Sequence, residues 1–154
     1  MSAKLAVGIV ATSNRDLLIE ALEALTGPGR PEVEHSIHLL DNASEDGTAE
    51  VVRERFPEVD LVAQPYRDGF GANHNRLLER NDAPYHLVLN DDATVEPGAL
   101  DLLVEHLDAH PEVAVAAPAV IYPDGRHQPA AWRFPDPAMC LRSLVTLEIG
   151  RAHV

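Results

Sequence analysis

The sequence predicts an α/β fold, a mostly parallel sheet with helices on both of its faces. Short apolar runs rich in Val, Ile and Leu alternate with segments whose apolar residues recur at helical spacing. Strands that alternate with helices form parallel sheets, because the crossover helices must cover the faces of the sheet. Polar residues directly follow three of the apolar runs, at Thr12, at Asp41, and at Asp91 and Asp92. Such sheets bind ligands outside the carboxyl ends of their strands.

The first half of the chain gives three strands and two helices. The run LAVGIVA is short, apolar and uninterrupted, which is typical of a strand buried on both faces. Leucines at helical spacing follow it until Gly27, Pro28 and Gly29 end the helix. The second helix ends before Pro57, because a residue that precedes proline disfavours the α conformation. We therefore expect strands over 5–11, 36–40 and 59–63, and helices over 15–25 and 48–55.

The second half continues the alternation of helices and strands and then departs from it. Gly69 to Asn75 is expected as a glycine-containing loop that leads into a helix with Leu77 and Leu78. A strand over 85–89 follows, then a helix marked by Leu100, Leu103, Val104 and Leu107 that stops at His110 and Pro111. Two further elements are expected, a fifth strand over 113–117 and a hairpin whose turn is the YPDG sequence at 122–125.

Composition excludes several classes of protein. The chain has 154 residues, 12 of them Lys or Arg and 25 of them Asp or Glu, for a net charge of −13. One domain fits this length, and the acidic balance argues against a nucleic-acid binder and against a polybasic membrane anchor. A lone cysteine, Cys140, excludes an internal disulfide and a multi-thiolate metal site. No apolar run approaches the ~20 residues of a membrane span, and no signal peptide is found, so we expect a cytoplasmic location.

Two acidic groups are the candidates for ligand binding. Asp91 and Asp92 repel each other, and a divalent cation such as Mg²⁺ or Mn²⁺ would offset that repulsion. The alternative is that one of them caps the following helix. Asp41 could accept a hydrogen bond from a nucleotide base, or it could belong to an ordinary turn in which Asp46 or Thr48 caps a helix.

Other patterns are weaker. Gly69 and Gly71 suggest a phosphate cradle, but their spacing fits neither dinucleotide nor P-loop motifs, and they could simply permit a tight turn. His106 and His110 have a metal-binding spacing, yet surface histidines are the better interpretation. No Gly-x-Ser-x-Gly or Ser/His/Asp pattern supports acyl transfer.

Six motifs in order resemble the inverting family 2 glycosyltransferases, and most of all their rhamnosyltransferase-like branch. The similarity covers about residues 4 to 138. The motifs are VGIVATSN at 7–14, LLDNASEDGT at 39–48, GFGANHNRL at 69–77, LVLNDDATVEPGAL at 87–100, HPE at 110–112, and DGR at 124–126 with RFP at 133–135. This resemblance implies the GT-A fold, a Rossmann-like α/β sheet, and a nucleotide-sugar donor such as a UDP- or dTDP-sugar.

The resemblance also implies roles for individual residues. Asp92 matches the metal ligand of the family's DxD motif, and Asp91 the residue near the ribose, with Asn90 in the place of the motif's first aspartate. Asp41 matches the carboxylate that binds the base, and Gly69 lies in the loop near the nucleotide. Three further residues match positions around the base and phosphates: Ala11, Thr12 and Arg15.

The expected catalytic base is missing, because family members are longer and carry it in an acidic segment beyond this match. We therefore expect 1–138 to be the nucleotide-sugar-binding part of a truncated GT-A domain, and 139–154 to be an incomplete segment. Residues 149–154 resemble a translated sequencing adapter, with a genuine short tail as the alternative. Such a chain should transfer sugar poorly or not at all. The full-length enzyme would act on a glycan or lipid-linked acceptor, at the membrane face.

Two other functions fit part of the pattern. A non-catalytic module that binds a nucleotide or a metal ion would use the same strand-end carboxylates. A flavodoxin-like receiver would also bind Mg²⁺, but it needs its acidic pair after the first strand, where this chain has Thr12 and Ser13.

Overall fold

A computed structural model of the chain describes residues 3–128. The chain divides into two units, Met1–Ala116 and Ala117–Val154, of which the first holds the sheet and its helices. The RFP motif at 133–135, Cys140 and the segment 139–154 lie outside the described residues.

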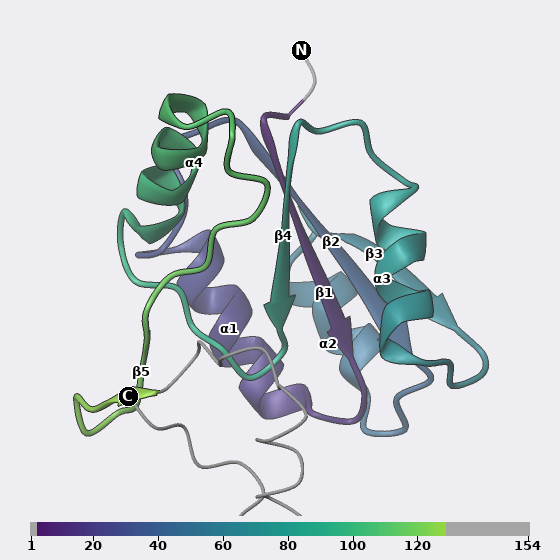
Figure 1. The fold of residues 1–154 in the computed structure, drawn as a ribbon. Helices are drawn as coiled ribbons and strands as arrows, with labels where there is room; N and C mark the ends of the chain where they lie inside the picture. Colours follow the sequence, from purple (N-terminus) through teal and green to yellow (C-terminus); the bar gives the residue numbers. More distant parts are fainter. Residues whose placement is uncertain (1–2, 129–154) are drawn as a thin grey trace, which may run out of the picture. The chain divides into compact units, whose positions relative to one another are not determined.

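The sheet of the first unit has four parallel strands in the order β3-β2-β1-β4 (Figure 1). Leu5 lies opposite both His35 and Tyr85, so the neighbours of β1 run in step with it. This register confirms the expected parallel sheet and brings the carboxyl ends of the strands to one edge. The strands are β1 (Leu5–Ala11), β2 (His35–Asn42), β3 (Asp60–Gln64) and β4 (Tyr85–Asn90).

One face of the sheet carries the main core. Alternate side chains of a strand point to opposite faces, and the odd-numbered residues of β1 and β2 face three helices. These helices are α1 (Arg15–Thr26), α2 (Thr48–Arg55) and α4 (Ala99–Ala109). Leu18, Leu22 and Leu25 of α1 are fully buried, as their helical spacing predicts. No helix within residues 3–128 has the length and apolar character needed to cross a membrane.

A single helix of the described chain, α3 (Phe70–Leu78), packs on the other face. Leu77 of α3 packs over Gly8 of β1, where even an added Cβ would be in ordinary van der Waals contact, 3.5 Å from a methyl group of Leu77. Helices therefore cover both faces, as expected. The loop expected over 69–75 is wrong in its extent, because α3 begins at Phe70 and Gly69 occupies its N-cap position.

The fifth parallel strand, expected over 113–117, does not form. These residues have no regular structure, and Val115 is 83% exposed. Three alanine and valine residues of this segment instead line a cavity of about 280 Å³ beside β4 and α4. The backbone of an apolar run forms a strand only when it hydrogen-bonds to a neighbouring strand. Among the described strands β4 pairs with β1 alone, so residues 113–117 do not pair with it.

A hydrogen-bonded chain of Ser36, His38 and Asp60 joins β2 to β3. The Ser36 hydroxyl lies 2.8 Å from Nε2 of His38, whose Nδ1 lies 3.0 Å from the Asp60 carboxylate. This Ser/His/Asp arrangement has no local sequence pattern, since its residues come from two strands. Asp60 also pairs with Arg80, and the His38 ring is buried, so the chain ties the two strands together.

The described part of the second unit is a two-stranded antiparallel hairpin, β5 (Val120–Ile121) and β6 (His127–Gln128). The amide of Tyr122 donates to the carbonyl oxygen of Arg126 at 2.8 Å, and Gly125 has φ +82°. The expected turn at 122–125 is confirmed.

Gly29 is the glycine where a side chain is least tolerable. A Cβ there would lie 2.2 Å from the carbonyl oxygen of Val95, in the loop before α4. Gly29→Ala should therefore lower the free energy of unfolding by about 1–3 kcal/mol, because backbone must move to accept the methyl group. Urea denaturation followed by circular dichroism measures this change.

Gly71→Ala is the matched control, since nothing lies within 4 Å of a Cβ on Gly71 and it sits within α3. This variant should be unchanged or stabilised by up to about 1 kcal/mol. Equal stability of the two variants would contradict the close approach at Gly29.

Candidate functional site

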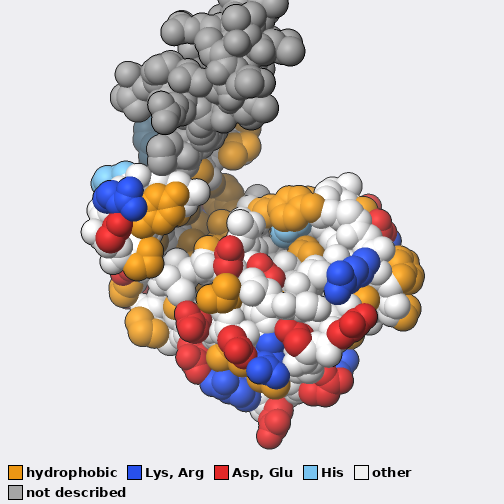
Figure 2. Space-filling view, turned by 90° about the horizontal axis from the view of Figure 1, so that it is seen from below, with side chains coloured by type: hydrophobic (Ala, Val, Ile, Leu, Met, Phe, Trp, Pro, Cys, Tyr) orange, Lys and Arg blue, Asp and Glu red, His pale blue; other side chains and the backbone are white. Residues whose placement is uncertain are grey.

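A cavity of about 560 Å³ opens at the carboxyl ends of β1 and β4, beside the first turns of α3. Figure 2 looks at the molecule from this end and shows acidic and basic side chains interspersed with uncharged surface. This is the edge at which parallel sheets bind ligands. The cavity is lined by residues 10, 12–14, 42, 70, 73, 74 and 89–92.

The turns after β1 and β2 hold each other in place. Ser13 and Ala43 both have positive φ, +52° and +56°, which is uncommon for residues with a Cβ. The amide of Ser13 donates to the Ser44 hydroxyl at 2.8 Å, and the amide of Arg15 donates to Asp46 at 3.0 Å. Contacts between the turns thus stabilise a strained backbone at the cavity, a common feature of binding sites.

Asp46 caps two helices at once. Its carboxylate accepts from the amide of Arg15 at the start of α1, and from the amide and hydroxyl of Thr48 at the start of α2. Desolvation raises the pKa of this carboxyl, but these hydrogen bonds outweigh it and hold the pKa below its usual 3.8. Capping by Asp46, part of the alternative interpretation of this turn, is observed. It extends to α1, whose N-cap residue Asn14 makes no side-chain cap.

Asn42 is the centre of a network of buried amide side chains. Its Nδ2 donates to the Thr12 hydroxyl at 3.1 Å and to the carbonyl oxygen of Asp68 at 3.2 Å. Its Oδ1 accepts from Gln64 at 2.6 Å and from the amide of Asp68 at 2.9 Å. Asn73 of α3 joins the network through Gln64 and the Asp68 carbonyl. The network fixes Thr12 and the loop before α3 to the end of β2.

Arg76 completes this network from α3. One nitrogen of its guanidinium donates to Gln64 and to Asn73, both at 2.9 Å, and the other donates to the Asp68 carboxylate at 2.6 Å. The amide of Gly69 and the guanidinium of Arg76 hold the pKa of Asp68 below its ordinary value. The N-terminus of α3 is therefore anchored before any ligand binds.

Asp91 and Asp92 follow β4 and reach the cavity. The alternative that one of them caps the following helix is wrong, because α4 begins at Ala99 with Gly98 at its N-cap position. No ion pair within the described part of the chain uses either carboxylate. Hard oxygen donors open to solvent suit Mg²⁺ or Mn²⁺, which keep water or phosphate as further ligands. Residues 3–128 contain no cluster of three or more metal-ligating side chains.

The cavity brings together only part of the predicted set. Thr12 lines it with the two aspartates, whereas four predicted residues do not line it: Ala11, Arg15, Asp41 and Gly69. Ala11 is fully buried, and the guanidinium of Arg15 donates to Asp16 and to the carbonyl oxygen of Asp46. Asp41 is 4% exposed and accepts from the amide of Ser44 at 3.3 Å. Its odd number puts it on the face of α1 and α2, opposite to α3.

Several cavity residues were missed by sequence reasoning. Phe70 and His74 are one turn apart on α3, and their tilted rings pack together with centroids 4.4 Å apart. Asn42 and Asn73 line the cavity from the amide network. Arg67 is exposed and reaches the Ser13 hydroxyl at 3.4 Å from the loop before α3. A helix expected to begin at Phe70 would have predicted the pairing of Phe70 with His74, since residues four apart share a helix face.

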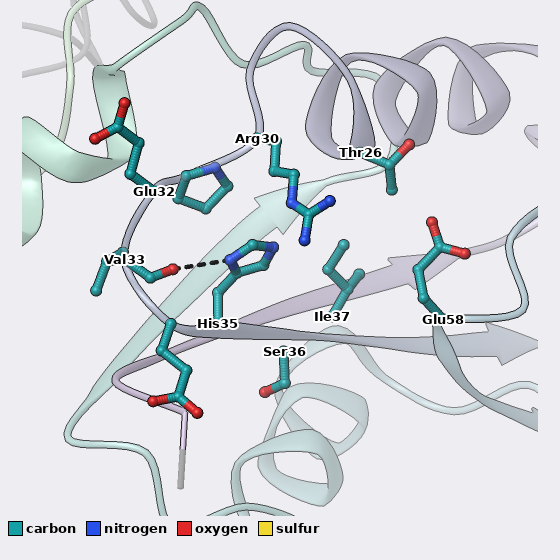
Figure 3. A pocket seen from close by; sticks show the side chains of 10 residues that line it. Thr26, Arg30, Glu32, Val33, His35, Ser36, Ile37 and Glu58 are labelled. Atoms are coloured by element: carbon teal, nitrogen blue, oxygen red, sulfur yellow. Dashed lines mark hydrogen bonds between the residues drawn. The ribbon is translucent and has the colours of Figure 1, made fainter. Parts of the chain in front are cut away.

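A second cavity, of about 640 Å³, lies beside the start of β2 (Figure 3). Arg30, Glu58 and His35 line it, and Nδ1 of His35 donates to the carbonyl oxygen of Val33 at 2.9 Å. None of the predicted site residues reaches it, and it lies at the amino ends of the strands. We therefore place the candidate functional site in the smaller cavity.

His106 and His110 stack on each other with ring centroids 4.3 Å apart. Nδ1 of His110 donates to the carbonyl oxygen of His106 at 2.9 Å, and both residues are exposed on α4. Their geometry agrees with the interpretation as surface histidines.

The chain matches a family model and curated relatives. Residues 7–151 match the model described as Glycosyl transferase family 2. The chain is 30% identical over 111 residues to N-acetylglucosaminyl-diphospho-decaprenol L-rhamnosyltransferase from two strains of Mycobacterium tuberculosis, a match that covers 65% of this chain and 36% of the relative. The chain thus spans about a third of the length of the curated relatives it matches.

Solved glycosyltransferases share the fold. Residues 1–349 of TarS from S. aureus, solved with UDP-GlcNAc, give a TM-score of 0.61 at 20% identity, covering 70% of this chain and 32% of that one. The mannosyltransferase PcManGT from Pyrobaculum calidifontis, solved with GDP-Man and Mn²⁺, gives 0.62 at 23% identity, covering 80% and 37%. These similarities confirm the expected GT-A fold.

Removing the Asp46 carboxylate should destabilise the turns of the site. Asp46→Ala should lower the free energy of unfolding by about 1–2 kcal/mol, because two helices lose a cap. The lowered pKa stabilises the fold above pH 3.8, and this contribution is lost as the pH falls through the folded-state pKa. Wild type should therefore lose more stability between pH 5 and pH 3 than Asp46→Asn does.

Urea denaturation at the two pH values measures both effects. Asp82→Ala is the control, since Asp82 is exposed in the loop before β4, and it should match wild type. An Asp46→Ala variant as stable as this control would contradict the double cap.

Proposed function

This chain belongs to glycosyl transferase family 2, and on that premise we propose that it forms the part of a glycosyltransferase that binds the nucleotide-sugar donor. One observation carries the proposal. The parallel register brings Thr12, Asp91 and Asp92 to one cavity at the carboxyl ends of β1 and β4. That cavity has the strand-end position of a nucleotide site. The family match favours this function over a non-catalytic nucleotide- or metal-binding module and over a receiver.

The proposed metal ligand is Asp92, with Asp91 directed to the ribose of the donor. Both carboxylates line the cavity, and Asp92 is exposed, so a hard cation can reach it without breaking an existing ion pair. PcManGT, a structural neighbour, was solved in complex with GDP-Man and Mn²⁺. A bound Mg²⁺ or Mn²⁺ would supply charge that stabilises the departing diphosphate.

The base end of the donor is proposed to lie near Asp41 and Ala11, with Gly69 and Arg15 close to the nucleotide. Asp41 uses one oxygen to hold the amide of Ser44. No buried side-chain oxygen of the described residues lacks a partner, so its other oxygen retains some access to the surface. A carboxylate there can accept a base N–H. Arg67 contacts the Ser13 hydroxyl and is exposed. Because the chain has a net charge of −13, this cation would help to attract an anionic donor.

In the proposed reaction, an acceptor hydroxyl attacks the sugar carbon from the side opposite to the diphosphate, with inversion. The residues of this chain would bind and orient the donor, and Thr12 is held for that purpose by Asn42. A general base must take the acceptor proton, and we assign it to the longer protein. The matched relative is named as an N-acetylglucosaminyl-diphospho-decaprenol L-rhamnosyltransferase, which supports a glycan or lipid-linked acceptor. The proposed donor is a UDP- or dTDP-sugar. Residues 1–138 would be the donor part, and transfer by residues 1–154 alone would be poor.

Binding of UDP or dTDP should require a divalent cation. Isothermal titration calorimetry with and without Mn²⁺ should show binding tighter by at least tenfold with the metal, because the cation neutralises phosphate charge next to Asp92. Asp92→Asn should lose most of this dependence, whereas the exposed control Asp82→Asn should keep it. Equal affinity of wild type with and without Mn²⁺ would exclude the metal role.

Asp41 should select the base. Asp41→Asn keeps the size of the side chain but removes its charge, and a hydrogen bond to a charged group is worth about 1.5–3 kcal/mol. The variant should lose tenfold or more of its preference for UDP over CDP in Mn²⁺ titrations, because cytosine lacks the N3–H of uracil. An unchanged ratio of the two dissociation constants would place the base elsewhere.

A further inference from the structure

His74 is a buried polar side chain of the cavity, and the proposed binding of the donor gives it no role. It lies in the second turn of α3 and is only 6% exposed, yet it lines the cavity together with Asp91 and Asp92. The Phe70 ring packs against it in a tilted arrangement, with a centroid distance of 4.4 Å and an interplanar angle of 57°. Phe70 itself is 63% exposed. Both side chains line the cavity, the imidazole buried and the phenyl ring exposed.

The imidazole of His74 has no partner within the described residues. No residue within 3–128 forms a hydrogen bond with either ring nitrogen of His74. Among these residues, every side-chain nitrogen that is closed off from solvent has a hydrogen-bond partner. The nitrogens therefore keep contact with open space. Burial lowers the pKa of His74, so the ring is neutral at pH 7. A neutral imidazole offers one hydrogen-bond donor and one acceptor.

We propose that His74 is a specificity residue of the donor cavity, which hydrogen-bonds a hydroxyl group of the transferred sugar. This inference rests on the proposed function. A hydroxyl group both donates and accepts, so it can bond either nitrogen of a neutral ring, whereas a phosphate oxygen only accepts and can pair with the protonated nitrogen alone. Water would otherwise occupy these nitrogens, and a sugar hydroxyl replaces it with little loss of hydrogen bonding.

The position of His74 favours the sugar over the ribose. Asp41, the proposed base ligand, faces α1 and α2 on one side of the sheet, while His74 belongs to α3 on the other. Asp91 and Asp92 lie at the end of β4 and line the same cavity. A donor whose base is near Asp41 and whose diphosphate is near Asp92 would direct its sugar toward α3. The exposed ring of Phe70 would then lose water as the sugar covers it.

Two variants test the contact. His74→Phe keeps a ring that can stack on Phe70 but removes both hydrogen-bonding nitrogens, and His74→Gln keeps a donor and an acceptor. Each is titrated in Mn²⁺ with dTDP-rhamnose and dTDP, and with UDP-GlcNAc and UDP, by calorimetry. His74→Phe should weaken binding of the nucleotide sugar that wild type prefers by about five- to tenfold, the size of one net hydrogen bond. Its affinity for the matching nucleoside diphosphate should stay within twofold, and His74→Gln should recover most of the loss.

Each other outcome is decisive. Equal weakening of the nucleotide sugar and of its nucleoside diphosphate would place His74 against the ribose or phosphates and overturn the assignment to the sugar. Unchanged affinity for both ligands in His74→Phe would overturn any contact. Binding of neither ligand by wild type would overturn the proposed function and this inference with it, whereas binding by wild type with an insensitive His74→Phe overturns the inference alone.

Discussion

The parallel register of β1 with β2 and β4 is the constraint on which the candidate site depends. Because Leu5 is level with both His35 and Tyr85, the three strands end at the same edge. Thr12, Asn42 and Asp91 then meet there although about thirty to eighty residues separate them along the chain. The helices that return the chain between strands are needed to reach this register, and their leucines form the core that stabilises it.

Side-chain hydrogen bonds, rather than regular structure, fix the loops at this edge. Asp46 ties the starts of α1 and α2 together, and Asn42 ties the end of β2 to Thr12 and to the loop before α3. Buried networks of this kind are stabilising only when each polar atom has a partner, and every enclosed polar side-chain atom of the described residues has one. The backbone strain at Ser13 and Ala43 is therefore held before a ligand arrives, which lowers the entropic cost of binding.

Electrostatic repulsion opposes binding of the proposed ligand, because the chain has a net charge of −13 and the diphosphate is also negatively charged. Asp91 and Asp92 attract a cation, and Arg67 lies exposed at the edge of the turn after β1. His74 adds no charge when buried, so it suits an uncharged part of the ligand. The cavity thus has two parts: the end at Asp91 and Asp92 suits charged groups of the ligand, and the side at His74 suits neutral polar groups.

The sequence by itself determined the alternation of strands and helices, the parallel sheet and the acidic strand ends, because these follow from local periodicity and turn chemistry. It predicted a strand over 113–117 that does not form, although the outer edge of β4 has no partner among the described strands, and it began α3 too late. Tertiary structure alone decided which side chains share the cavity. Asp41 and Asn42 are adjacent, yet a strand turns them to opposite faces, so Asn42 lines the cavity while Asp41 is buried beside α1 and α2. His74 likewise became a candidate only when α3 packed over β1, since burial and an unpartnered ring depend on neighbours that are distant in sequence.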